Sequence, residues 1–309
     1  MIVFGSSITD PDMYRGCAER GIRLIAEPGS EIIANAAAGS LARSYNLIMN
    51  QARELEDLEA LVLVHQDAEI VDPEFCAKLR ATLQDPDVGA AGLVGAIDVR
   101  SIAWWEGSVT WASFTHRYKE FGGGEIKAFT WGEEEFPGYA RAGEVDTLDG
   151  FVLGLSPWVV RNIRFDETIS QIHGYDLDFC LQVREAGRKV VTMDSKAVHH
   201  HSLELVTDPD VWMAAHMKLA DKWHGRMPGV GLPNWGSDPD DWKGRARHAE
   251  AEAGAAHLEL VSTKMQAEAR ERRLREELEE IRASTSWRLT RPLRELGLLL
   301  RGRANGRAR

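Results

Sequence analysis

The chain has 309 residues, of which 44% are hydrophobic and 28% charged, and its formal net charge is −11. This length and composition predict one large or two ordinary globular domains with a sizeable core, and they exclude a disordered chain. Residues 282–309 carry +7, which leaves −18 for residues 1–281, so a nucleic-acid binder with a basic folded surface is excluded.

Strands and helices alternate along the first 100 residues. The predicted strands are residues 1–7, 22–27, 60–65 and 88–96, and the predicted helices are residues 10–21, 40–56 and 72–84. Alternation at this spacing is typical of βαβ units, so we predict an α/β fold with a mainly parallel central sheet and flanking helices.

The remainder of the chain changes character several times. Residues 99–145 hold four tryptophans among glycines and acids, which indicates hairpins or long loops laid over the sheet. Ordered structure is expected again over residues 145–162, in helices at 175–189 and 209–224, and in a strand at 190–202. We therefore predict one main domain at 1–224, a linker or wrap-around loop at 225–244, a long helix at 245–283 and a basic amphipathic tail at 284–309.

The stretch "LVLVHQDAEIVDP" (61–73) is a buried strand that ends in polar residues. Side chains at the carboxyl ends of parallel strands face the crevice where ligands bind, and a carboxylate there suits Mg²⁺ or Mn²⁺. Asp67 is therefore a candidate metal ligand, although a strand-end acid is also a common helix cap. Asp72 precedes Pro73 in N-cap form, so we assign the cap to Asp72.

Three further clusters combine acids or histidines with predicted element ends. Asp176 and Asp178 are two apart in one helix, so one faces the crevice as a base while the other forms a salt bridge or cap, or both complement the helix dipole. In "VHHHS", His199 and His201 share a strand face and His200 takes the other. Asp149 before Gly150 either forms a turn or lines the crevice.

These segments together resemble the family-two inverting glycosyltransferases of GT-A fold, in particular a bacterial subgroup with "HQD" in place of Asp-x-Asp. The resemblance covers roughly residues 1–205 and runs through the segments "SLARSYN", "LVLVHQDAE", "DTLDGFVLGLSPWVVRNIRFDE", "HGYDLDFCLQVREAGRKV" and "HHHS". The usual signatures of nicotinamide, ATP-hydrolysing and serine-hydrolase enzymes do not occur in the sequence.

The resemblance implies a role for each matching residue. Asp67 corresponds to the acid that holds Mn²⁺ or Mg²⁺, Asp176 corresponds to the general base, and His200 is the first choice among the three histidines for a second metal or phosphate ligand. The implied donor contacts are Glu27 at the nucleobase or ribose, Asn46 at the diphosphate, His65 in place of the first motif acid, and Asp149 at the sugar. Tyr45 and Tyr175 stand where the family has Arg and Glu.

The implied activity is a metal-assisted, inverting, hexosyltransferase-like transfer from a nucleotide-diphospho-sugar to a glycan or lipid-linked acceptor in bacterial surface polysaccharide synthesis. Trp104, Trp105, Trp111 and Trp131 then either stack on sugars or anchor loops. A catalytically silent, glycan-binding or scaffold protein is the alternative, because His65 replaces a metal-motif acid. A sugar-phosphate nucleotidyltransferase is disfavoured, because "FGSSITDPD" is not a Gly-rich basic loop.

The location and assembly of the protein follow from its cysteines and its tail. Three scattered cysteines without CxxC spacing, no signal peptide and no membrane-length apolar run favour the cytoplasm. Residues 284–303 suit an interfacial helix at the inner face of the cell membrane, or a helix packed on the catalytic domain or a dimer partner. Residues 245–283 carry a partial coiled-coil seam, which is one route to a homodimer.

Overall fold

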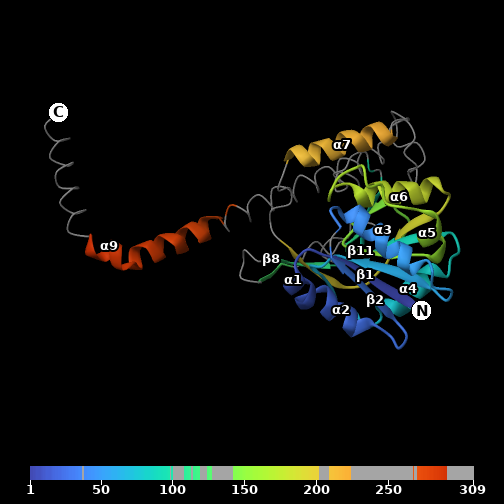
Figure 1. Ribbon diagram of the computed structural model, residues 1–309, viewed down its shortest axis with the longest axis horizontal. Helices are drawn as coiled ribbons and strands as arrows, with labels where there is room; N and C mark the ends of the chain where they lie inside the picture. Colours follow the sequence, from blue (N-terminus) through green and yellow to red (C-terminus); the bar gives the residue numbers. More distant parts are fainter. Residues whose placement is uncertain are drawn as a thin grey trace, which may run out of the picture. The chain divides into compact units, whose positions relative to one another are not determined.

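The computed structural model describes residues 1–36, 38–97, 99, 108–112, 114–118, 124–126, 142–201, 209–223, 267 and 270–290. It divides into two compact units, Met1–Leu258 and Glu259–Arg309. The first unit contains a six-stranded sheet with helices on both faces (Figure 1). The predicted α/β fold class, with a mainly parallel central sheet and flanking helices, is confirmed.

The central sheet has the strand order β12-β5-β11-β3-β1-β2. All of its strands run parallel except β11, which pairs antiparallel with both β3 and β5. The strands are β1 (Ile2–Ile8), β2 (Glu31–Ala36), β3 (Ala60–Val64), β5 (Val88–Gly92), β11 (Val152–Leu155) and β12 (Lys189–Thr192).

Alternating side chains of the central strands supply two separate cores, as the period of two along a strand requires. Phe4 and Val62 pack on one face against α1 (Pro11–Gly16), α2 (Ala18–Ile25) and α4 (Phe75–Leu83). Leu61 and Leu63 pack on the other face against α3 (Leu41–Ala52), α5 (Pro157–Asn162) and α6 (Tyr175–Glu185). Strand β3 is therefore buried on both faces, and polar side chains follow only after its last residue.

Two smaller sheets complete the described part of this unit. One has the order β10-β6-β7 and the other the order β4-β13-β8-β9. Their strands are β4 (Ala68–Ile70), β6 (Val94–Ile97), β7 (Ser108–Ala112), β8 (Phe114–Tyr118), β9 (Gly124–Ile126), β10 (Thr147–Leu148) and β13 (Ala197–His201). Helix α7 (Pro209–Trp223) buries Ala215, Leu219 and Trp223 against residues of α6.

Three predicted elements are corrected. The strand expected at 22–27 is wrong, because residues 18–25 form α2, with Ile22 and Ile25 on its buried face, and the second strand is β2. The single strands expected at 88–96 and 190–202 each divide between two sheets. Leu93 separates β5 from β6, and residues 193–196 separate β12 from β13.

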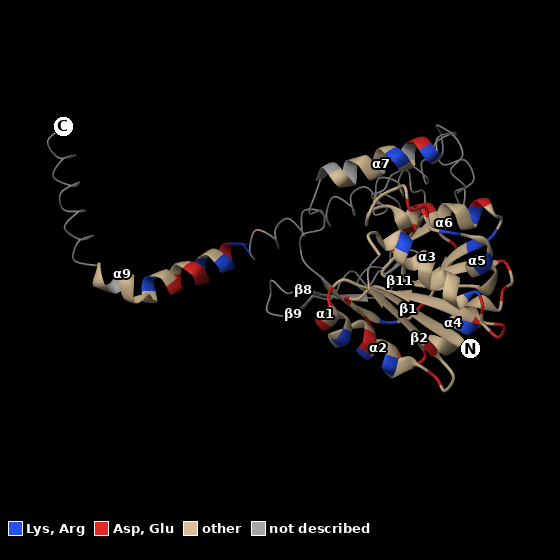
Figure 2. Ribbon diagram, in the orientation of Figure 1, with Lys and Arg blue, Asp and Glu red and all other residues tan. Residues whose placement is uncertain are grey.

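The second unit is described over residues 267 and 270–290. Residues 270–283 are helical, as predicted for part of the long helix, and α9 (Thr285–Leu289) follows after Ser284. Both acidic and basic residues lie along this helix (Figure 2), and Leu274, Leu278 and Ile281 are exposed on it. The expected linker, the upstream part of the long helix and most of the basic tail lie outside the described residues.

No helix of the described residues combines the length and apolar character that a bilayer crossing requires.

Candidate active site

One edge of the central sheet gathers polar side chains from several segments. Strand β3 ends at Val64, which pairs with Val152 at the start of β11, so the residues before β11 lie beside His65. The His65 N–H donates to the carbonyl of Phe151 at 2.9 Å. Strand β13 arrives at the same edge, because its His199 pairs with Ala68 of β4. A crevice at strand carboxyl ends is the expected ligand position in such a sheet.

His65, Asp67 and His199 form a group of ligand atoms that lie within 4.8 Å of one another. Asp67 Oδ1 is 3.6 Å from His199 Nε2 and 4.0 Å from His65 Nδ1. All three side chains are partly exposed, and His199 stacks on Phe151. Two imidazoles and a carboxylate around one point are a donor set that fits a divalent metal ion.

The electrostatics of this group also suit a cation. Burial alone would raise the pKa of Asp67, but His199 and His65 outweigh it and hold the pKa well below the usual range. Burial lowers the pKa of His65, against the opposing charge of Asp67. His65 is therefore a neutral imidazole near pH 7, which is the form that binds metals, and Asp67 is ionised.

His200, the expected metal ligand, lies elsewhere. Its Nε2 is 2.8 Å from Glu69 Oε2, and Glu69 is buried and also paired with Arg20. Its backbone N–H, rather than its ring, reaches the metal group, by donating to the Asp67 carbonyl at 2.7 Å. The structure thus brings His199 to Asp67 and turns His200 toward the ion pair that the buried Glu69 forms with the exposed Arg20.

Helix α6 begins beside the metal group and presents Asp176. Gly174, with φ of 72°, turns the chain into the helix in a conformation that favours glycine. Asp176 accepts hydrogen bonds from the N–H groups of Gly150 at 3.0 Å and Leu177 at 2.9 Å. Burial first, and then the charge of Asp149, raise the pKa of Asp176 to about 7 against these donors. A carboxylate poised near neutral pH in a crevice is a candidate general base.

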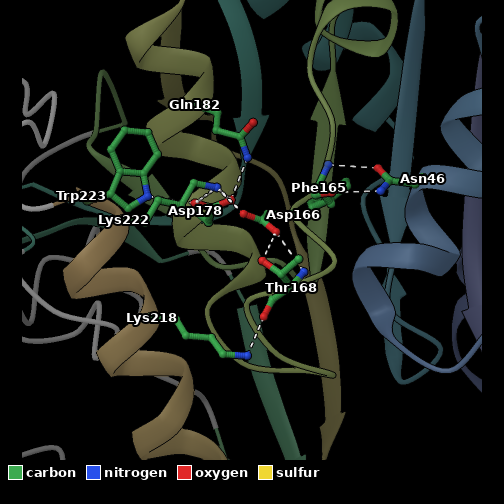
Figure 3. A network of polar contacts seen from close by, with 9 residues as sticks. All are labelled: Asn46, Phe165, Asp166, Thr168, Asp178, Gln182, Lys218, Lys222 and Trp223. Atoms are coloured by element: carbon green, nitrogen blue, oxygen red, sulfur yellow. Dashed lines mark hydrogen bonds and ion pairs between the residues drawn. The ribbon is translucent and has the colours of Figure 1, made fainter.

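Asp178 points to the other side of α6, as two-residue spacing predicts, and it is fully buried. It accepts hydrogen bonds from Gln182 Nε2 at 2.7 Å and Trp223 Nε1 at 2.8 Å, and it pairs with Lys222 Nζ at 2.8 Å (Figure 3). Lys222 also reaches Asp166 at 2.7 Å. Asp178 is therefore the structural acid of the pair, and it ties α7 to α6.

Two residues that were expected to contact the sugar donor, Glu27 and Asn46, lie away from the metal group or are already hydrogen-bonded to other residues. Glu27 pairs with Arg80, which also pairs with Glu59 next to the first residue of β3, so Glu27 lies at the opposite edge of the sheet. Asn46 uses its amide group to hold the chain after α5, exchanging two hydrogen bonds with the backbone of Phe165 (Figure 3) and donating to Glu167.

Asp149 lies in the turn before β11. It directly precedes Gly150, is partly exposed, and accepts from the Phe151 N–H at 3.1 Å through its side chain. Asp149 thus makes a turn and its charge acts on Asp176, while its expected contact with the sugar stays a prediction.

Sequence reasoning assigned no role to the two tyrosines at this edge. The His65 Nε2 and the Tyr175 hydroxyl are 2.6 Å apart, and Tyr45 packs against both rings. Among the described residues, the buried Tyr45 hydroxyl has no hydrogen-bond partner. Gln66, between His65 and Asp67, bonds to Thr9 and Asp10 and so orders the turn after β1. The unusual residues Tyr45 and Tyr175 were the available sequence signal.

Comparison with known proteins gives a family match over most of the chain. The model of a family described as "Glycosyltransferase like family" matches residues 3–220. The streptomycin biosynthesis protein StrF of Streptomyces griseus is 28% identical over 204 residues, which cover 65% of this chain and 67% of that protein. The O-antigen biosynthesis protein RfbC of Myxococcus xanthus is 24% identical over 182 residues, which cover 55% of this chain but 13% of that protein.

Among solved structures, the mannosyltransferase PcManGT of Pyrobaculum calidifontis, determined in complex with GDP-Man and Mn²⁺, is similar at 12% identity and a TM-score of 0.45. The match covers 93% of this chain and 82% of that chain.

Proposed function

The chain belongs to the glycosyltransferase-like family, and from this premise we propose that it transfers a sugar from a nucleotide-diphospho-sugar to an acceptor hydroxyl with inversion. One arrangement carries this function. The raised-pKa carboxyl of Asp176 lies at the same strand edge as the His65, Asp67 and His199 group, and Tyr175 bonds to His65 directly beside it. A base and a cation site in one crevice are what transfer from a diphosphate donor requires.

The residues fit a divalent metal ion. His65, Asp67 and His199 would hold it, and a donor set with two imidazoles suits Mn²⁺ better than Mg²⁺, which prefers oxygen ligands in a regular octahedron. When bound, such an ion supplies charge stabilisation to the leaving diphosphate. Asp67 enters the site ionised, whereas its charge outweighs burial and raises the pKa of His199, so metal binding must displace the proton that His199 holds in the metal-free site.

Asp176 serves as the general base. It takes the proton of the acceptor hydroxyl as that oxygen bonds to the anomeric carbon of the sugar, while the bond from this carbon to the phosphate oxygen breaks. Because the displacement is direct, the configuration inverts and one base suffices. The N–H groups of Gly150 and Leu177 hold the carboxylate in place, and Asp149 keeps it basic.

The two sequence relatives support a biosynthetic role. One is named for streptomycin biosynthesis and the other for O-antigen biosynthesis. We infer that the acceptor is a glycan or a lipid-linked glycan of a surface polysaccharide. Membrane contact through residues 284–303 and pairing of two copies through residues 245–283 stay predictions.

A thermal-shift screen of nucleotide sugars, with and without Mn²⁺, tests this function. A donor that binds the folded chain raises its unfolding temperature by mass action, and the shift should depend on Mn²⁺ and disappear in Asp67→Ala. Mn²⁺-dependent hydrolysis or transfer of the same donor then reports catalysis. If no donor shifts the wild type and none is hydrolysed, the catalytically silent glycan-binding or scaffold role replaces the transferase.

Neighbouring histidines provide a matched test of the metal site. His199→Ala removes a metal ligand. Loss of an outer-shell partner of a ligand already costs about 10- to 100-fold in metal affinity, so His199→Ala should weaken Mn²⁺ binding at least that much. His200→Ala should leave Mn²⁺ affinity unchanged and act only on folding stability, through Glu69. Calorimetric titration of Mn²⁺ into both variants gives the answer, and a larger loss in His200→Ala would reject the assignment.

The pH dependence of transfer follows from Asp176. The base must be ionised, so kcat/KM should rise about tenfold per pH unit below its pKa of about 7 and level off above it. Asp149→Asn removes a negative charge beside Asp176, so it should lower this pKa and move the acid limb to lower pH. Initial rates across the neutral range measure both profiles, and an acid limb that Asp149→Asn does not move would contradict the expectation.

A further inference from the structure

His65 contacts two different partners through its two ring nitrogens. Its Nε2 is 2.6 Å from the Tyr175 hydroxyl, while its Nδ1 faces Asp67 Oδ1 at 4.0 Å. A neutral imidazole has one nitrogen that carries hydrogen and one that carries a free electron pair. Which nitrogen carries the pair decides whether His65 can contribute to the metal group at all.

The geometry leaves one productive choice. Nε2 is occupied by the Tyr175 hydroxyl, so the nitrogen that can share a cation with Asp67 and His199 is Nδ1. Nδ1 binds a cation only with its electron pair, and the ring hydrogen must then lie on Nε2 and be donated to the Tyr175 oxygen. In the other tautomer, Nδ1–H points at Asp67 and His65 is not a ligand.

Packing holds Tyr175 in place, so its hydroxyl can determine which nitrogen of His65 carries the hydrogen. It is buried at the first position of α6, after the left-handed Gly174, and its ring packs edge-on against Tyr45 at 6.0 Å and against Phe165 at 6.0 Å. A side chain at Gly150 would overlap the Tyr175 hydroxyl, so glycine there leaves the space that the hydroxyl fills.

We propose that Tyr175 is a positioning residue whose hydroxyl accepts the Nε2 hydrogen of His65 and so keeps Nδ1 free to bind a divalent cation with Asp67 and His199. This role rests on the proposed function, because it concerns the same metal group. Tyr175 itself touches neither the cation nor the sugar. It replaces the carboxylate or carbonyl that more commonly orients a metal-binding histidine.

Tyr175→Phe tests the proposal, and Tyr45→Phe is its matched control. Both changes remove one buried hydroxyl from the same ring cluster, but only the Tyr175 hydroxyl bonds to His65, while the Tyr45 hydroxyl has no partner among the described residues. Calorimetric titration with MnCl₂ should show about 10- to 100-fold weaker binding for Tyr175→Phe and wild-type binding for Tyr45→Phe.

A second readout follows the tautomer directly. Nitrogen-15 NMR of the metal-free protein should show His65 with hydrogen mainly on Nε2 in the wild type and in Tyr45→Phe, and a shift toward the Nδ1–H form in Tyr175→Phe. Should Tyr175→Phe fail to fold, Gly150→Ala displaces the same hydroxyl and is expected to weaken Mn²⁺ binding likewise.

The outcomes separate this inference from the proposed function. Wild-type Mn²⁺ affinity in Tyr175→Phe, together with loss of binding in Asp67→Ala, would overturn the role of Tyr175 and leave the metal site standing. Failure of the folded wild type to bind Mn²⁺ would overturn both.

Discussion

Replacing Asp176 by Asn is expected to lower transferase turnover by about 10²–10⁴-fold, the usual contribution of a positioned base, while donor binding persists. The amide keeps the shape of the side chain and its oxygen still accepts from Gly150 N–H, but it takes no proton from the acceptor. Steady-state transfer assays combined with donor titration measure the two effects separately. Normal turnover of this variant with the true acceptor would reject Asp176 as the base.

The same variant should be more stable than the wild type at alkaline pH in the absence of metal. The folded pKa of Asp176, about 7, lies above the ordinary 3.8, so the unfolded chain releases this proton first and folding free energy is lost as the pH rises from about 4 to about 7, with the loss complete above pH 7. Each pKa unit corresponds to about 1.4 kcal/mol, and this partly exposed carboxyl sets an upper limit of about 4 kcal/mol. Urea unfolding at pH 4 and 9 should show little gain at the lower pH and the full gain at the higher pH, which also demonstrates that the inactive variant is folded.

Lys222→Met is expected to destabilise the catalytic unit by about 3–5 kcal/mol, because it leaves the buried charge of Asp178 without its cation. Methionine retains most of the apolar stem of lysine, so the lost charge rather than lost packing dominates. Urea or thermal unfolding measures the change in the free energy of unfolding.

Lys218→Met is the matched control for this change. Lys218 lies on the same helix but is exposed, and within the described part of the chain it donates only to the Thr168 carbonyl, at 2.6 Å, so its loss should cost about 1 kcal/mol or less. Adding Asp178→Asn to Lys222→Met should recover much of the lost stability, since no buried charge then remains. Equal effects of Lys222→Met and Lys218→Met would show that the buried charge is compensated in another way.

The sequence predicted the core elements because strand and helix periods differ along most of them. Strand 60–65 and helix 40–56 correspond closely to β3 and α3. The short apolar run Ile22, Leu24 and Ile25 was misassigned because so few residues fit either period. Its helical identity depends on Ile22 and Ile25 packing into the core on one face, which is a tertiary effect.

The candidate site was only partly predictable for a related reason. Asp67 and Asp176 could be found because a strand end and a helix start each expose an acid to the crevice. The choice between His199 and His200 depends on the pairing of β13 with β4, in which His199 lies opposite Ala68. Strand register joins residues about 130 positions apart, and nothing within "VHHHS" records it.

Glu27 and Asn46 show the same limit of prediction from sequence. Both residue types suit a donor contact, yet Arg80 and the Phe165 backbone occupy them in the fold. A polar residue's partners are decided by distant segments, so residue type alone does not separate a ligand contact from a structural one.

Helix α7 determines how far the chain must extend for the buried acid of this domain to be paired with a cation. The family match stops at residue 220, two positions before Lys222 and three before Trp223, the two α7 residues that bond to Asp178. A chain ended at that boundary would enclose an acid in its core with no cation to meet it. The unit that can be inherited, fused or exchanged between proteins as an intact piece therefore extends at least through Trp223, beyond the family match.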